Sequence, residues 1–290
     1  MSSTIGRKVQ DQEIFRHARD TWGTLITRRP FASPVAAYLI VAGLYIGGRF
    51  LEGTVKAGDY LILRAGGDPI RPAVDPDYHL NVFWHSLSAI VLSMVVLTLF
   101  LKLMDVRPRA VLAPGPPSSV GFFTILYIFL TIIGAAAMAA LAPLFNFEPA
   151  FPHPSTDGPW AFLGMMASSF EAGFTEEIFL VIIPVLLLRS IGQRWWVIVA
   201  VLTVLRISFH VYYGWPSLGL LVWAVGALVF FYFTRCGIAL IIGHGLRNFL
   251  GTLSVLYGEE LTTLAVLLLL LLVFVFRFFM RRTDFDPLRP

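Results

Sequence analysis

Charged side chains and cysteine are scarce in this chain of 290 residues. Only 14% of the residues are Asp, Glu, Lys or Arg, and 57% are hydrophobic, whereas a soluble domain carries about 25% charged residues. A soluble globule could not cover so large an apolar core with so little polar surface. This excludes an ordinary soluble enzyme, a disordered chain and a secreted disulfide scaffold. The single cysteine, Cys236, excludes an intrachain disulfide and a metal site made of cysteines alone.

What the chain has instead is a series of long apolar stretches. A helix needs about 20 such residues to cross the roughly 30 Å hydrocarbon core of a bilayer. The sequence therefore predicts an all-α, polytopic membrane helix bundle of about eight transmembrane helices, which we expect in the lipid bilayer of a bacterial plasma membrane. The predicted spans are 34–51, 82–103, 120–144, 161–188, 195–213, 217–234, 237–256 and 261–279.

Lys and Arg are distributed unevenly between the loops, and cytoplasmic loops carry the excess in membrane proteins. The loops 145–160 and 214–216 have neither residue, and the 52–81 loop offsets its three Lys and Arg with five acids. Both termini are therefore expected in the cytoplasm, and the net charge of +4 requires no nucleic-acid partner. The cytoplasmic segments with Lys or Arg are 1–33, 104–119, 189–194, 235–236 and 281–290.

These assignments predict one transmembrane domain, 34–280, between an N-terminal arm (1–33) and a short tail (281–290). The arm is either an amphipathic helix on the membrane surface or a polar tail. The first alternative is suggested by apolar residues at helical spacing, which are Ile14, Phe15, Ala18, Trp22 and Leu25.

The charged and strongly polar side chains within the predicted spans are concentrated on three of them. A charge at the centre of a bilayer costs at least about 2.5–3.5 kcal/mol, so such residues are functional candidates. Span 161–188 carries acids, and spans 195–213 and 237–256 carry bases and an amide. The candidates are Glu171, Glu176 and Glu177, then Arg206 and His210, then His244, Arg247 and Asn248.

The spacing of these residues indicates how they are oriented. His244 and Asn248 are four residues apart and share one helix face. Glu176 and Glu177 project about 100° apart and cannot point at the same place. We expect one of the two to face a catalytic water and the other to pair with a cation such as Arg206 or Arg247. Small residues before the pair, including Gly164 and Gly173, would allow a neighbouring helix to approach closely.

A carboxylate and imidazoles in a partly dry pocket can activate water without a covalent nucleophile. No G-x-S-x-G elbow surrounds any serine of the chain. A zinc site is the alternative, with Glu176, His210 and His244 as ligands, although the helical H-E-x-x-H pattern is absent.

Three segments together resemble a known signature. They are Glu176-Glu177-Ile-Phe-Leu, Arg206-Ile-Ser-Phe-His210-Val-Tyr-Tyr-Gly214 and His244-Gly-Leu-Arg-Asn248. In this order, each on its own predicted span, they resemble the CPBP family of CAAX prenyl proteases and bacteriocin-processing proteins. The resemblance covers about residues 160–256 and implies intramembrane proteolysis of a peptide or membrane-protein substrate.

The resemblance also implies roles for individual residues. Glu176 corresponds to the general base that activates water, and His210 shares that task. His244 and Asn248 correspond to the pair that stabilises the oxyanion, and Glu177 to a supporting carboxylate. Both glutamate-type and metallo-type mechanisms have been argued for the family. We favour the glutamate type, without a cofactor, because Asn248 is a poor zinc ligand.

The chain departs from the family pattern at two positions. The arginine of the first motif would fall at Val181, and the phenylalanine of the second motif would fall at Arg206. We expect Arg206 to pair with Glu177 in place of the missing arginine, with Arg247 as a further supporting residue. Without such compensation the chain would be a weakened member of the family.

Other functions stay open at this point, as does the oligomeric state. The departures permit a non-catalytic scaffold, chaperone or immunity protein, and a Glu–His pair also suits a proton-coupled transporter. The predicted depths of the motifs disagree, since His210 would lie nearer the non-cytoplasmic end than Glu176. Either a span near 160–190 is misplaced or the site opens outward.

Overall fold

The computed structural model describes residues 22, 25–26, 33–50, 78–115, 117–145, 160–210 and 213–258. Every regular element in these residues is helical and none is a strand, which confirms the all-α class. The predicted span 261–279, the tail 281–290 and almost all of the arm 1–33 lie outside the described residues.

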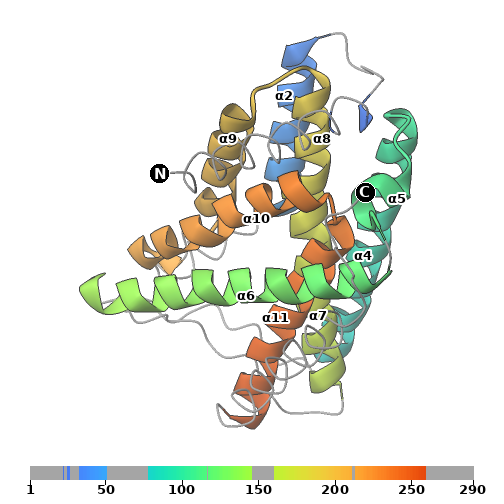
Figure 1. The fold of residues 1–290 in the computed structure, drawn as a ribbon. Helices are drawn as coiled ribbons and strands as arrows, with labels where there is room; N and C mark the ends of the chain where they lie inside the picture. The colour runs from blue at the N-terminus through green and yellow to red at the C-terminus, as the bar shows by residue number, and fades with distance from the viewer. Residues whose placement is uncertain are drawn as a thin grey trace, which may run out of the picture.

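The elements follow one another in a simple order (Figure 1). Three stretches of the described residues are long and apolar enough to cross a membrane, namely Tyr78–Leu103, Ser119–Leu144 and Trp215–Thr234. The α-helices are α2 (Pro34–Tyr45), α4 (Tyr78–Leu103), α5 (Pro108–Leu112), α6 (Pro117–Leu141), α7 (Ala161–Glu177), α8 (Ile183–Ser190), α9 (Trp195–Ser208), α10 (Leu221–Thr234) and α11 (Gly237–Tyr257). Shorter elements are the π-helical η1 (Ile46–Phe50) and η3 (Ile178–Ile182) and the 3-10 helices η2 (Ala142–Phe145) and η5 (Trp215–Leu220).

Helices α7 and α8 are joined by η3 without a break, so residues 161–190 form one long helical rod. The π-helical turn begins directly after Glu177 and ends before Pro184. Proline has no N–H to donate, and a local widening of the helix is one way in which membrane helices accommodate it. The adjacent glutamates therefore sit at the irregular point of the rod.

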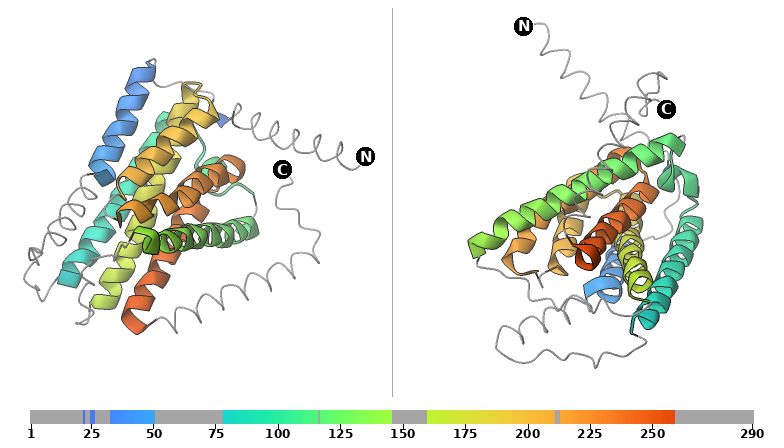
Figure 2. Two further views of the ribbon diagram at one scale, coloured as in Figure 1. Left: turned by 90° about the vertical axis from the view of Figure 1, so that its left-hand side faces the viewer. Right: turned by 90° about the horizontal axis from the view of Figure 1, so that it is seen from below.

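The rod is the centre of the bundle. Helix α7 packs between α4 and α11, while α6 packs against α11, η5 and α10. Figures 1 and 2 show α6 crossing the rod steeply rather than running alongside it. Motif-bearing segments far apart in the sequence are in this way brought to one region of the molecule.

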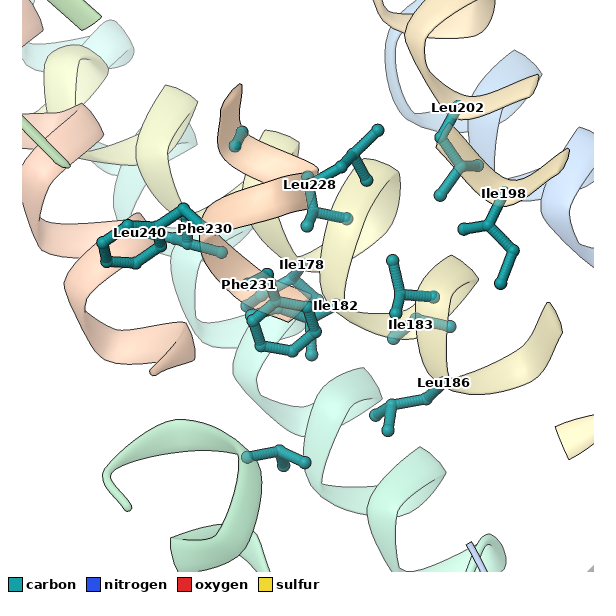
Figure 3. Close-up of a cluster of buried hydrophobic side chains, with 14 of the residues drawn as sticks. Ile178, Ile182, Ile183, Leu186, Ile198, Leu202, Leu228, Phe230, Phe231 and Leu240 are labelled. Carbon is teal, nitrogen blue, oxygen red and sulfur yellow. The ribbon is translucent and has the colours of Figure 1, made fainter. Parts of the chain in front are cut away.

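A buried apolar cluster holds the rod against α9 and α10 (Figure 3). Ile183 and Leu186 of the rod face Ile198 and Leu202 of α9 in this cluster, while Ile182 lies beside Phe231 of α10, and all are at most 2% exposed. Such apolar packing gains little from the hydrophobic effect inside a bilayer, where van der Waals contact and polar bonds dominate helix association. The polar contacts near the rod therefore carry much of the specificity.

The ends of two predicted spans differ from the structure. Helix α4 begins at Tyr78 rather than at residue 82, so His79 lies within it. Helix α9 ends at Ser208 rather than at residue 213, so His210 lies in the turn that follows the helix. The sequence did not reveal this end, because no proline, glycine, Lys, Arg, Asp or Glu occurs between Ser208 and Gly214.

The predicted close approach at the small residues of α7 is confirmed. A Cβ added at Gly173 would lie 2.5 Å from the Ile241 carbonyl oxygen and 2.8 Å from the Gly245 nitrogen, both in α11. A Cβ at Gly164 would lie 2.6 Å from the His79 carbonyl oxygen in α4. Two neighbouring helices therefore touch the backbone of α7.

Replacing Gly173 by Ala should separate α7 from α11 and lower the free energy of unfolding by about 1–3 kcal/mol, the usual cost of overpacking. Thermal unfolding in detergent measures this. The matched control is Gly121→Ala in α6, where nothing lies within 4 Å of an added Cβ. The control should be neutral or slightly stabilising because alanine favours helix. Equal stability of the two variants would contradict the close approach.

Candidate functional site

The three motif segments meet at a cavity of about 490 Å³. Glu176 comes from α7, His210 from the turn after α9, and His244 and Asn248 from α11. Arg247 also reaches the cavity, whereas Glu177 and Arg206 do not line it. Further lining residues come from α4, α6, η5 and α10, among them His79, Met138, Leu220 and Trp223.

Glu177 lies behind the cavity wall and is completely buried. Its Oε1 pairs with Nη2 of Arg206 and accepts a hydrogen bond from Tyr127 Oη at 2.9 Å, while Arg206 Nη1 donates to Oε2 at 3.2 Å. His244 Nδ1 lies 2.8 Å from the same Oε1. The predicted pairing of Arg206 with Glu177 is thus confirmed, and it joins α6, α7, α9 and α11 at one carboxylate.

Trp223 of α10 completes this network. The guanidinium carbon of Arg206 lies 3.8 Å from the centroid of the indole ring, a cation–π contact. The indole Nε1 donates to Tyr127 Oη at 3.1 Å. A charged guanidinium is costly to bury in a bilayer. That of Arg206 has a carboxylate and an aromatic face as partners.

Tyr127 and Trp223 were not among the residues that the sequence pointed to. Their positions in the sequence did offer a clue. Tyr and Trp usually lie at the ends of a membrane span, whereas these two lie within their apolar spans. Spacing could not connect them to Glu177, because each comes from a different helix.

His244 stands between the two glutamates. The carboxylate of Glu177, paired with Arg206, is ionised and can only accept hydrogen bonds. The imidazole tautomer that fits has its proton on Nδ1, donating to Glu177. The opposite nitrogen, Nε2, lies 4.0 Å from Oε2 of Glu176. A carboxylate behind a histidine in this way fixes the ring and its tautomer.

His210 is oriented by its own backbone. Its Nδ1 lies 2.8 Å from the carbonyl oxygen of Arg206, which can only accept, so Nδ1 is the protonated nitrogen. In the neutral ring Nε2 is then a proton acceptor. The His210 ring is held between Phe209 and Trp223, with ring centroids 3.9 and 5.8 Å away.

Arg247 orients the amide of Asn248. Its Nη1 donates to Asn248 Oδ1 at 3.1 Å. Because the amide oxygen is engaged, the NH₂ group of Asn248 is left as the donor that a bound molecule can use. Both residues line the cavity, in agreement with a supporting role for Arg247.

Glu171 also lines the cavity, one and a half turns before Glu176 on α7. Its Oε2 accepts a hydrogen bond from Ser86 of α4 at 2.7 Å. Glu171 therefore ties α7 to α4, while Glu176 lies beside the histidine that Glu177 holds.

Cys236 and two of the three candidate serines, Ser169 and Ser208, are engaged in other contacts, while Ser168 lines the cavity. Ser208 bonds Tyr45 of α2 at 2.5 Å and does not line the cavity. Ser169 lines it but donates to the Met165 carbonyl. Cys236 is buried between α10 and α11, where desolvation raises the pKa of its thiol to about 11. A thiolate nucleophile is therefore disfavoured.

The suggested zinc set does not fit the geometry. Within the stretches that the structure describes, no group of three or more His, Cys, Asp or Glu side chains is placed to hold a metal ion. Because Nδ1 of His210 and Nδ1 of His244 contact the Arg206 carbonyl and Glu177, only the Nε2 atoms of the two rings could bind a metal, and they are not placed with Glu176 as such a group. No step is therefore assigned to zinc.

The chain matches no protein-family profile, no curated protein and no solved structure. The case for a function therefore rests on the residue pattern and on the geometry described above.

Arg206→Leu should lower the free energy of unfolding by about 3–5 kcal/mol, because it leaves Glu177 as a buried, unpaired charge. Denaturant or thermal unfolding in detergent measures the loss. Adding Glu177→Gln removes the charge but keeps an acceptor for Tyr127 and His244, so the double variant should recover a large part of the stability. A double variant that is less stable than Arg206→Leu alone would contradict the pairing as the source of the loss.

Proposed function

We propose that this chain is an intramembrane endopeptidase of the CPBP type, which cuts a peptide or membrane-protein substrate with an activated water. The observation that carries the proposal is the separation of the two adjacent glutamates. One is neutralised by Arg206 behind the wall, and the other stands in the cavity beside His244. A carboxylate that lines a partly dry cavity next to an imidazole is well placed for proton transfer.

In the proposed reaction Glu176 takes a proton from water as the water oxygen bonds to the carbonyl carbon of the substrate peptide. His210, through Nε2, accepts a hydrogen bond from the same water and orients it. The tetrahedral intermediate then breaks at its C–N bond, and the proton held by Glu176 passes to the leaving nitrogen. The products are a new carboxylate and a new amine.

The negative charge on the carbonyl oxygen needs donors, and the NH₂ group of Asn248 supplies one. His244 supplies the second when Nε2 also carries a proton. Two carboxylates flank this imidazole, with Glu177 2.8 Å from Nδ1 and Glu176 4.0 Å from Nε2. Glu177 thus acts through His244 and does not touch the substrate.

In this proposal the domain carries the eight spans expected from the sequence, in a bacterial plasma membrane with both termini cytoplasmic. The three long apolar helices and the excess of Lys and Arg on one set of loops support that placement.

Glu176→Gln should abolish cleavage, with a loss of about 10²–10⁴-fold for a missing general base. The assay is cleavage of a membrane-peptide library by the purified protein in lipid. Glu171→Gln is the matched control, because it changes the same side chain on the same helix and cavity but keeps an acceptor for Ser86. The control should retain most of the activity.

Full activity of Glu176→Gln would contradict the assignment of the base. No cleavage by the wild-type chain under any condition would instead favour a non-catalytic scaffold. Cleavage that persists in excess chelator is expected for the glutamate mechanism, and its loss would favour the zinc alternative.

A further inference from the structure

The helix ends that carry Lys and Arg lie together at one end of the bundle. Trp22 of the N-terminal arm packs on Trp195 and donates its indole N–H to the Tyr232 carbonyl at 2.9 Å. The thiol of Cys236 lies 3.6 Å from the Leu112 carbonyl. These contacts join the arm, the start of α9, the end of α10 and the α5 segment into one end, which we call the basic end. Its cations include Lys102, Arg107, Arg109, Arg189, Arg194 and Arg235.

The opposite ends of the same helices also lie together. Trp160 contacts Phe83 of α4 through their rings, and Phe162 contacts Phe249 of α11. A Cβ added at Gly219 would meet the backbone of Met138, which places η5 against the end of α6. Of the connecting segments at this end, 146–159 and 209–214 contain no Lys or Arg, whereas 51–77 contains three.

The cavity belongs to the second of these ends. It is lined by the first residues of α4, by Thr131 and Met138 in the later half of α6, and by Gly251 and Thr252 near the end of α11. None of the segments that form the basic end lines it. We infer that the cavity opens at the non-cytoplasmic face of the membrane, opposite to the basic end.

The cavity is assigned to the non-cytoplasmic face because loops rich in Lys and Arg are costly to translocate across the membrane. Such loops therefore stay on the cytoplasmic side. The 51–77 segment, on the cavity side, has three Lys and Arg but also five acids. The neighbouring 146–159 segment has none. The bias therefore holds at the connections of the described helices with 51–77 as the exception.

The early end of α9 explains how His210 and Glu176 reach the same cavity, although the sequence predicted different depths in the membrane for them. Because α9 ends at Ser208, the chain turns before it crosses the whole bundle, and His210 reaches the cavity from this turn. No span near 160–190 has to be moved, since the rod 161–190 is continuous. Of the two alternatives, the outward-opening site agrees with the structure.

The opening determines the class of substrate, and this part of the inference rests on the proposed function. Water and peptide would reach Glu176 from outside the cytoplasm. The substrate is then a peptide segment on the outer side of the membrane, such as the outer flank of a membrane helix or a secreted peptide. A cytosolic protein tail would have no route to the cavity.

Thiol labelling from one side of the membrane tests the opening. Cys236 is the single native cysteine and is buried at the basic end, so Cys236→Ala gives a cysteine-free background. Ser168→Cys and Gly251→Cys, made separately, place thiols in the cavity. Gln193→Cys places one in the 189–194 loop at the basic end without changing its charge. The probe is a charged, membrane-impermeant maleimide, applied to intact spheroplasts and again after permeabilisation.

We expect both cavity cysteines to react in intact spheroplasts and to gain little on permeabilisation, while Gln193→Cys reacts only after permeabilisation. Cavity cysteines that react only after permeabilisation would overturn the inference, whether or not Gln193→Cys reacts in intact spheroplasts.

The labelling should be unchanged in the Glu176→Gln background, because access does not depend on catalysis. Failure of the proposed hydrolysis and failure of the proposed opening are therefore separate results.

Discussion

The buried pair of Glu177 and Arg206 is the interaction on which the rest of the site depends. Both side chains are at most 1% exposed, and a bilayer offers no water to solvate them. The pair is tolerated because both groups have further partners, with Tyr127 donating to the carboxylate and Trp223 covering the guanidinium. A buried ion pair gives little net stability, but removing one partner is costly. It therefore enforces a single arrangement of four helices.

The same pair separates the tasks of two neighbouring glutamates. Helix geometry directs them about 100° apart, so Glu177 faces the network while Glu176 faces the cavity. His244 connects the two sides, with one nitrogen on Glu177 and the other toward Glu176. Through this imidazole the structural carboxylate orients the group that would contact substrate. The π-helical turn after Glu177 lies at the same place, as such turns often do at functional sites.

The helical class, the close approach at Gly173 and the Glu177–Arg206 pairing could all be predicted from the sequence, because each follows from local spacing or from the cost of a buried charge. Tyr127 and Trp223 could not, because no spacing rule relates side chains on different helices. The end of α9 was also missed, since no proline, glycine, Lys, Arg, Asp or Glu marks it before Gly214. Whether Glu176 and His210 catalyse hydrolysis stays a prediction.

The most direct test of this account compares Glu176→Gln with Glu177→Gln in the purified protein, by thermal unfolding in detergent. Glu177→Gln should lower the free energy of unfolding by about 3–5 kcal/mol, because Arg206 is left as a buried, unpaired charge. Glu176→Gln should lower the stability much less, because Arg206 keeps its bonds to Glu177. Equal destabilisation by the two substitutions would contradict the division between a structural and a reactive glutamate.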